Sequence, residues 1–180
     1  MSTVSLGEDL KSLIRNVPGF PKPGIVFRDL TTLFLDGPAF RRTVDWIAAE
    51  ARTKKAEVLV GIESRGFILA GAAAAQLELP LALARKLGKL PWESVKETYT
   101  LEYGISTLEM HRDAVRSGQP VLIVDDLLAT GGTAAAAIRL VEKLGGRVVG
   151  VVFVVELSFL GGRAPLKGYP VSALVDYTSE

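Results

Sequence analysis

The chain has 180 residues, of which 48% are hydrophobic and 23% charged, and its formal net charge is +1. This length fits one globular domain with a sizeable core, and the near-zero net charge excludes a global basic field for nucleic acid or an anionic membrane. Because the chain has no cysteine, disulfides, thiolate catalysis and cysteine-ligated metals are also excluded.

The N-terminal third combines helical and irregular patterns. Residues 6–17 have the spacing of a short amphipathic helix, and a proline-rich stretch then enforces an irregular segment. An extended piece is predicted over residues 24–30 and a helix over residues 38–54. No apolar stretch approaches the roughly 20 residues of a membrane span, and the acidic start is unlike a secretory signal. We therefore expect a soluble protein, and we place it in the cytoplasm.

Further along the chain, strands and helices alternate. Strands are predicted over residues 57–63, 80–85, 105–111, 121–124, 147–156 and 170–177, and helices over residues 66–77 and 134–144. The intervening residues 87–106 are polar and have no clear period. Alternation of this kind predicts an α/β fold with a parallel sheet covered on both faces, and ligands of such sheets bind beyond the carboxyl ends of the strands.

Residues 121–133, Val-Leu-Ile-Val-Asp-Asp-Leu-Leu-Ala-Thr-Gly-Gly-Thr, are the most informative stretch. Small residues between a strand and a helix let backbone N–H groups converge on an oxyanion, typically a phosphate. Adjacent carboxylates at a strand end, here Asp125 and Asp126, can hold ribose hydroxyls or a hydrated Mg²⁺. The pattern indicates a sugar phosphate and matches neither a P-loop nor a dinucleotide fingerprint. The alternative is an ordinary turn and helix cap.

Cations follow two other predicted strands. Arg65 lies near a helix start, where the helix dipole disfavours a cation unless an anion binds there. Residues 85–89 add Arg85, Lys86 and Lys89, which suit a pyrophosphate leaving group. The alternatives are a surface ion pair between Arg65 and Glu63 or another acid, and an ordinary solvated run of charges at residues 85–89.

Two further segments have open interpretations. Residues 90–104 form a long connection, which favours a lid over the site, although disorder or a dimer contact is equally compatible with it. Phe27, on a proline-bounded segment, could lie against a flat base, but a phenylalanine in such a place more often belongs to a core. His111, the single histidine, is assigned no role.

Four ordered blocks, residues 20–29, 61–67, 85–91 with 101–104, and 124–133, resemble the type I phosphoribosyltransferases, and among them the adenine-specific ones. The resemblance covers nearly the whole chain. It implies one phosphoribosyltransferase domain over residues 1–180. Within it, residues of about 1–35 would form an N-terminal hood that contributes base recognition, and about 88–106 a flexible catalytic loop.

The resemblance also implies the reaction, in which N9 of adenine joins C1 of phosphoribosyl pyrophosphate (PRPP) to give AMP and pyrophosphate. By resemblance the site residues divide as follows: Glu102 and Arg65 are catalytic; Asp125, Asp126, Ala129, Thr130, Gly131, Gly132, Thr133, Arg65, Lys86 and Lys89 bind PRPP; Val26, Phe27 and Arg28 bind adenine; and Tyr103 belongs to the loop. Mg²⁺ is the expected cofactor, held mainly by substrate with Asp125 and Asp126 nearby.

The remaining expectations concern specificity and partners. Enzymes for 6-oxopurines typically carry an aspartate where this chain has Ala129, which argues against hypoxanthine or guanine. Glu63, where many members have aspartate, is a small departure. We expect a homodimer that binds neither nucleic acid nor membrane. Two alternatives stay open: a phosphoribosyltransferase for another base, such as xanthine or orotate, and a PRPP-binding regulator without catalysis.

Overall fold

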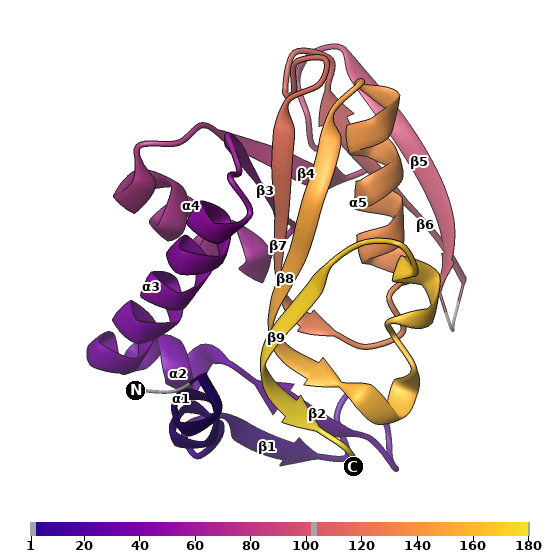
Figure 1. Cartoon of the computed structure of the whole chain (residues 1–180). Helices are drawn as coiled ribbons and strands as arrows, with labels where there is room; N and C mark the ends of the chain where they lie inside the picture. The colour runs from indigo at the N-terminus through magenta and orange to yellow at the C-terminus, as the bar shows by residue number, and fades with distance from the viewer. Residues whose placement is uncertain (1–2, 102–103, 180) are drawn as a thin grey trace.

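A seven-stranded sheet forms the centre of the computed structural model, which describes residues 3–101 and 104–179. The strand order is β5-β6-β4-β3-β7-β8-β9, and strands β4, β3, β7, β8 and β9 run parallel (Figure 1). The strands are β3 (Val58–Ile62), β4 (Leu81–Lys86), β5 (Ser94–Leu101), β6 (Gly104–His111), β7 (Pro120–Leu128), β8 (Arg147–Leu157) and β9 (Val171–Tyr177). The predicted α/β fold is confirmed.

Helices cover both faces of this sheet (Figure 1). Helices α3 (Gly37–Thr53) and α4 (Arg65–Leu77) lie on one face, and α5 (Gly132–Lys143) lies on the other. Because side chains alternate along a strand, β3 contributes to two cores: Val58 and Val60 pack on the α5 side, and Leu59 packs with α3 and α4. Burial on both faces explains why the central strands are continuous apolar runs.

Helix α5 packs very closely on the sheet. Residues 134–137, all alanine, are at most 7% exposed. Side chains of this size let the helix axis approach β7 and β8, and this approach fixes the helix N-terminus beside the end of β7. The helix ends at Lys143, and Gly145 follows with a left-handed φ of 83°, as expected for a glycine stop signal.

Residues 3–36 form a small layer that packs on the α3–α4 core, and we call it the hood segment. It consists of α1 (Thr3–Lys11), β1 (Arg15–Pro18), β2 (Val26–Asp29) and α2 (Thr31–Leu35), and β1 pairs antiparallel with β2 in a two-stranded sheet of its own. The predicted helix over residues 6–17 is therefore wrong in its second half. The chain turns after Lys11 because residues 15–18 exchange backbone hydrogen bonds with β2.

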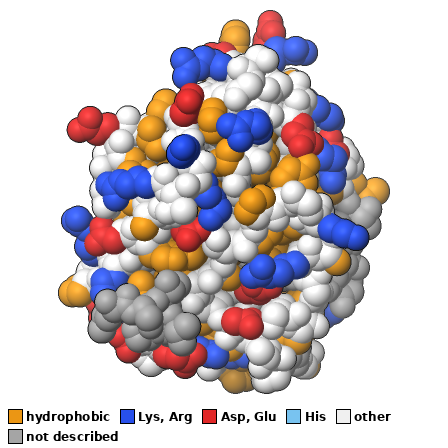
Figure 2. Space-filling view, in the orientation of Figure 1, with side chains coloured by type: hydrophobic (Ala, Val, Ile, Leu, Met, Phe, Trp, Pro, Cys, Tyr) orange, Lys and Arg blue, Asp and Glu red, His pale blue; other side chains and the backbone are white. Residues whose placement is uncertain are grey.

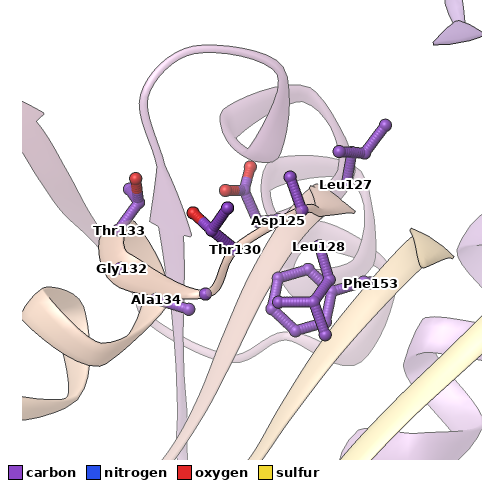
Figure 3. A pocket seen from close by; sticks show the side chains of 10 residues that line it. Asp125, Leu127, Leu128, Thr130, Gly132, Thr133, Ala134 and Phe153 are labelled. Carbon is purple, nitrogen blue, oxygen red and sulfur yellow. The ribbon is translucent and has the colours of Figure 1, made fainter. Parts of the chain in front are cut away.

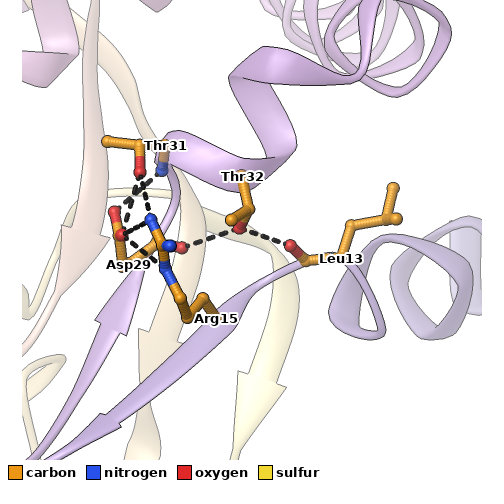
Figure 4. Close-up of polar contacts among 5 residues, drawn as sticks. All are labelled: Leu13, Arg15, Asp29, Thr31 and Thr32. Carbon is orange, nitrogen blue, oxygen red and sulfur yellow. Dashed lines mark hydrogen bonds and ion pairs between the residues drawn. The ribbon is translucent and has the colours of Figure 1, made fainter.

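Asp29 organises the junction between β2 and α2 (Figure 4). Its carboxylate accepts hydrogen bonds from the backbone N–H and the hydroxyl of Thr31, at 2.9 and 2.8 Å, and from Arg15 at 2.7 Å. The Thr31 N–H, more than any other partner, lowers the pKa of Asp29. The Thr32 hydroxyl donates to the carbonyl of Leu13 at 2.6 Å. These bonds fix the direction in which β2 enters the site.

The prediction of an irregular connection over residues 87–106 holds for residues 87–93 and is wrong for residues 94–101 and 104–106. Strands β5 and β6 form an antiparallel hairpin at the sheet edge, with Ser94 opposite His111 and Leu101 opposite Gly104. Residues 95, 97 and 99 are less exposed than their neighbours 96 and 98, which is the alternation expected of a half-covered strand. The motif strand is also longer than predicted, since β7 continues through both aspartates to Leu128.

Two 3₁₀ turns, η1 (Ser158–Leu160) and η2 (Ala164–Leu166), connect β8 to β9. The face in Figure 2 interleaves Lys and Arg side chains with Asp and Glu, without a large field of one sign. Among the described residues, no helix has both the length and the apolar character that a membrane crossing requires.

Candidate active site

Three strand ends meet at the carboxyl edge of the parallel sheet. Glu63 and Arg65 follow β3, Lys86 ends β4, and Asp125 and Asp126 lie near the end of β7. Because these strands are parallel neighbours, the segments surround one cavity of about 380 Å³, which is the size of a small-ligand site. Its lining residues are Glu63, Ser64, Arg65, Lys86, Tyr99, Ser106, Leu108, Asp125, Asp126, Leu127 and Thr133.

A second cavity of about 180 Å³ adjoins the first, and we call the loop that forms it, residues 129–133, the phosphate loop (Figure 3). Its lining consists of the loop itself with Asp125, Leu127, Leu128, Ala134 and Phe153. Asp125, Leu127 and Thr133 line both cavities. The smaller space suits a phosphate-sized group at the N-terminus of α5, where the backbone N–H groups favour an anion.

Two glycines make the phosphate loop possible. Gly131 has a left-handed φ of 81°, and a Cβ there would lie 2.2 Å from the carbonyl oxygen of Gly162. A Cβ on Gly162 would in turn lie 2.2 Å from the carbonyl oxygen of Ala129. The turn between β8 and β9 therefore supports the phosphate loop by backbone-to-backbone contact, which any larger residue would push apart.

The two adjacent aspartates have different environments. Asp126 is 5% exposed, and its backbone N–H donates to Asp125 Oδ1 at 2.9 Å. Burial, and then the charge of Asp126, raise the pKa of Asp125. The start of α4 can lie this close to β7 only because residue 66 is a glycine. A Cβ there would lie 2.8 Å from the carbonyl oxygen of Val124 and 3.0 Å from Asp125 Oδ1. Asp125 is half-buried and lines both cavities, so its carboxylate is accessible to hydroxyl donors of a ligand.

Arg65 connects two parts of the site. Its Nε donates to Asp126 Oδ2, so the ion pair with an acid that the sequence left as an alternative does occur. The same guanidinium lies 5.7 Å from the ring centroid of Phe27 in the hood segment. Phe27 is half-buried and packs edge-on against Phe20, with centroids 5.2 Å apart. Its ring belongs to neither hydrophobic core, which favours the base-binding interpretation over the core interpretation.

Two carboxylates hold the turn at the end of β4, residues 85–89, which we call the cationic turn. Glu63 Oε2 accepts from the backbone N–H of Lys86 at 2.9 Å and from Arg85 Nε at 3.3 Å. Glu109, 3% exposed, accepts from the backbone N–H groups of Lys89 at 3.0 Å and Leu90 at 3.1 Å. Arg85 Nη1 donates to the carbonyl of Lys89 at 2.9 Å. These bonds fix the turn on both sides.

Comparison with known proteins agrees with this geometry. Residues 31–171 match the phosphoribosyl transferase domain family. The adenine phosphoribosyltransferase of Solibacter usitatus is 55% identical over 94% of this chain and 98% of its own length. The chain belongs to the adenine phosphoribosyltransferase family. The family's crystal structure from Thermoanaerobacter pseudethanolicus superposes with a TM-score of 0.91 at 44% identity, covering 94% of this chain and 99% of that one.

Another adenine phosphoribosyltransferase, from Saccharomyces cerevisiae, was solved in complex with an imino-altritol bisphosphate and adenine. It is 39% identical, covers 94% of this chain and 98% of its own, and has a TM-score of 0.88. The Giardia lamblia enzyme, solved with 9-deazaadenine, is 33% identical over 99% of each chain, with a TM-score of 0.89.

The structure brings together most of the residues expected from the adenine phosphoribosyltransferase pattern. Those at the two cavities are Arg65, Lys86, Asp125, Asp126, Ala129, Thr130, Gly131, Gly132 and Thr133. Val26, Phe27 and Arg28 lie on β2. Arg65, which lines the larger cavity, lies near the Phe27 ring and so connects β2 to that cavity. Lys89 and Arg85 are not among the lining residues. Glu102 and Tyr103 lie outside the described residues.

Sequence reasoning missed three contributors to the site. Tyr99 lines the larger cavity, Gly162 supports the phosphate loop, and Glu109 holds the cationic turn. For Tyr99 the sequence offers a partial signal, the spacing of Val95, Tyr99 and Leu101 at every second or fourth residue, which is compatible with one covered face of a strand. Gly162 and Glu109 carry no local signal, because their contacts join segments distant in sequence.

Proposed function

We propose that this protein transfers the 5-phosphoribosyl group from PRPP to N9 of adenine and releases AMP and pyrophosphate. The observation that carries the proposal is the convergence of two acids, two cations and a phosphate loop on two adjoining cavities. This set matches the parts of PRPP in kind: hydroxyls face acids, and phosphates face cations and backbone N–H groups.

The residues divide the substrate between them. The phosphate loop would take the 5′-phosphate, and Asp125 and Asp126 would accept hydrogen bonds from the ribose hydroxyls. Arg65 and Lys86 would hold the pyrophosphate. Because Arg65 is paired with Asp126, PRPP must offer both partners a replacement: hydroxyls for the acid and a diphosphate for the cation. Lys89 belongs to the same proposal through its position in the cationic turn.

Bond cleavage at C1 leaves a sugar with oxocarbenium character, so the site must stabilise the departing pyrophosphate and exclude water. Arg65 and Lys86 would supply the first requirement. We assign the closing of the site to the segment of about residues 88–106, which includes Tyr103. Glu102 would manage the proton on the purine, a role for which general acid–base catalysis commonly contributes about 10²–10⁴-fold in rate.

Adenine would lie against Phe27, with the backbone of Val26 and Arg28 reading its edge. The proximity of Phe27 to Arg65 supports this arrangement, because a stacked base would then face the C1 side of the ribose site. Ala129 favours adenine over 6-oxopurines, since an aspartate typical of the latter enzymes is missing at that position.

We propose Mg²⁺ as cofactor. Asp125 and Asp126 offer oxygen ligands, which Mg²⁺ prefers. In this proposal the ion would be held mainly by the substrate phosphates, with Asp125 and Asp126 nearby. When bound, it would neutralise charge on the pyrophosphate. We further propose a homodimer acting in the cytoplasm, to be tested by light scattering and by localisation of a tagged protein.

The experiment that tests this function is a purine panel with PRPP and Mg²⁺, following nucleotide formation from adenine, hypoxanthine, guanine and xanthine. AMP from adenine alone is the expected result. Turnover of a 6-oxopurine would retain the PRPP site and refute the base assignment. Tight PRPP binding without turnover of any base would favour a PRPP-binding regulator.

A further inference from the structure

Tyr99 is a buried tyrosine at the site to which the proposed reaction gives no task. It is 9% exposed and lines the larger cavity together with Arg65, Lys86 and Asp126. Its hydroxyl accepts a hydrogen bond of 3.2 Å from the hydroxyl of Thr133. Thr133 ends the phosphate loop and lines both cavities. Tyr99 therefore reaches, from the hairpin, the point where the two cavities meet.

Contacts other than this hydrogen bond hold Tyr99 in place. Glu97, two residues earlier on the same face of β5, accepts from both Arg139 and Lys143 of α5. Lys143 Nζ also donates to the carbonyl of Lys96 at 2.8 Å. Strand β5 is thus tied to α5 independently of the Tyr99 hydroxyl. Removing that hydroxyl should leave the strand, the ring and its burial unchanged.

A phosphate bound in the loop would reverse which of the two hydroxyls, Thr133 or Tyr99, donates the hydrogen bond between them. A hydroxyl has one proton to donate and lone pairs to accept. Thr133 directs its proton to Tyr99 in this arrangement. A phosphate in the loop is an acceptor only, so it would take the Thr133 proton, and Tyr99 would then donate its own proton to Thr133 Oγ1. The pair can reverse its direction without moving a heavy atom.

We propose that Tyr99 is a positioning residue for the 5′-phosphate of PRPP, acting through Thr133. The inference rests on the proposed function. In this role Tyr99 orients the Thr133 hydroxyl toward the phosphate loop. When Thr133 donates its proton to the phosphate, the Tyr99 hydroxyl donates to Thr133 Oγ1. The proposed base-binding residues Val26, Phe27 and Arg28 lie on β2 and line neither cavity, so the affinity for adenine should not depend on the Tyr99 hydroxyl.

The test compares Tyr99→Phe with Tyr169→Phe. Tyr169 donates its hydroxyl to Glu142 at the same helix α5, outside the lining of both cavities, and so serves as a matched control. PRPP binding is measured by calorimetry with Mg²⁺, and KM and kcat are measured for both substrates. We expect the Kd for PRPP to rise about threefold to tenfold in Tyr99→Phe, the range of one hydrogen bond. The KM for adenine and the Tm should stay near those of the parent, and Tyr169→Phe should match the parent throughout.

A double-mutant cycle with Thr133→Val sharpens the assignment. If the two hydroxyls act as a unit, the double variant binds PRPP about as weakly as Thr133→Val alone. Strictly additive effects would overturn the proposal, as would a Tyr99→Phe Kd equal to that of the parent. A parent protein that binds PRPP but forms no AMP would refute the proposed function while the binding comparison still tests Tyr99. A parent that does not bind PRPP would overturn both.

Discussion

Ionisation of Asp125 lowers the stability of the fold, although the proposed function uses this acid to bind the substrate. Burial and the neighbouring Asp126 raise its pKa from an ordinary value near 3.8. The folded protein therefore holds this proton more tightly than the unfolded chain, and ionisation costs stability as the pH rises above about 3.8. Ionisation of this acid therefore destabilises the free protein, and a ligand whose hydroxyls donate to the carboxylate would offset that cost.

Asp125→Asn should therefore stabilise the free protein and weaken substrate binding. We expect a higher Tm at pH 7, by about 2–4 °C for each kcal/mol gained at this chain length. PRPP affinity should fall at least about tenfold, the scale of losing a hydrogen bond to a charged group. Thermal unfolding at pH 7 and pH 3 checks the first part, because the gain should vanish where the parent acid is already protonated. A Tm below that of the parent at pH 7 contradicts this account.

Glu102→Gln tests the proton-transfer assignment. The substitution keeps the size of the side chain and removes its acid, so PRPP binding should match the parent while kcat falls about 10²–10⁴-fold. Single-turnover kinetics with a calorimetric Kd separate the two effects. Turnover within a few-fold of the parent would remove Glu102 from the mechanism.

At the scale of elements, the contact between the phosphate loop and the turn after β8 offers a matched pair of glycines. Gly162→Ala would place a Cβ 2.2 Å from the carbonyl oxygen of Ala129, whereas Gly161, with φ of 68°, has open space around its missing Cβ. Both substitutions should lower the Tm, Gly161→Ala by backbone conformation alone. PRPP affinity should fall in Gly162→Ala only. Equal PRPP affinities in the two variants would mean that the turn does not support the loop.

The sequence was most informative where structure is local. The apolar run before Asp125 and the small residues after it predicted strand, loop and helix, because buried strands and phosphate loops impose strong patterns over about a dozen residues. It misled at residues 94–101, since the charged Glu97 lies on the covered side of that strand between Val95 and Tyr99 and interrupts the apolar–polar alternation. The short strand at residues 15–18 was missed because four residues define no period, and its pairing with β2 is what fixes it.

Contacts between distant segments were beyond local patterns. The support of Ala129 by Gly162 and the ion pair of Arg65 with Asp126 join segments 33 and 61 residues apart. The sequence offered the Arg65 ion pair as an alternative to pyrophosphate binding; the structure shows the ion pair with Asp126, and in our proposal PRPP replaces it. Such choices depend on the register between strands, which no single segment specifies.

At the scale of the whole molecule, acid should destabilise the fold. The pKa is lowered for Asp29, Asp45, Glu50, Glu63, Glu97 and Glu109. A lowered folded pKa means that the unfolded chain binds more protons in this range, so stability is present above about pH 4.5 and is lost as the pH falls through the folded values. Among the described acids with a shifted pKa, only Asp125 acts in the opposite sense. For Glu109, burial opposes the shift and is outweighed by the N–H groups of Leu90 and Lys89.

Urea unfolding at pH 7, 5, 4 and 3 measures this dependence. The free energy of unfolding should change little from pH 7 to 5 and fall steeply below. Glu109→Gln should flatten part of the slope, whereas Glu93→Gln, with a side chain 69% exposed, should leave it unchanged. A free energy of unfolding that is level from pH 7 to 3 would refute the assignment.

The anchorage of the hood segment has a consequence for the order of synthesis. Lys11 donates to the carbonyl of Asp176 at 2.8 Å, and the Arg28 guanidinium lies 4.1 Å from the ring centroid of Tyr177. The segment that is made first thus docks on the strand that is made last. A chain that still lacks β9 already carries residues 129–133, yet the contacts of Lys11 with Asp176 and of Arg28 with Tyr177 cannot form in it. In our proposal β2 recognises the base, so this part of the site would be completed after the ribose-phosphate part during synthesis.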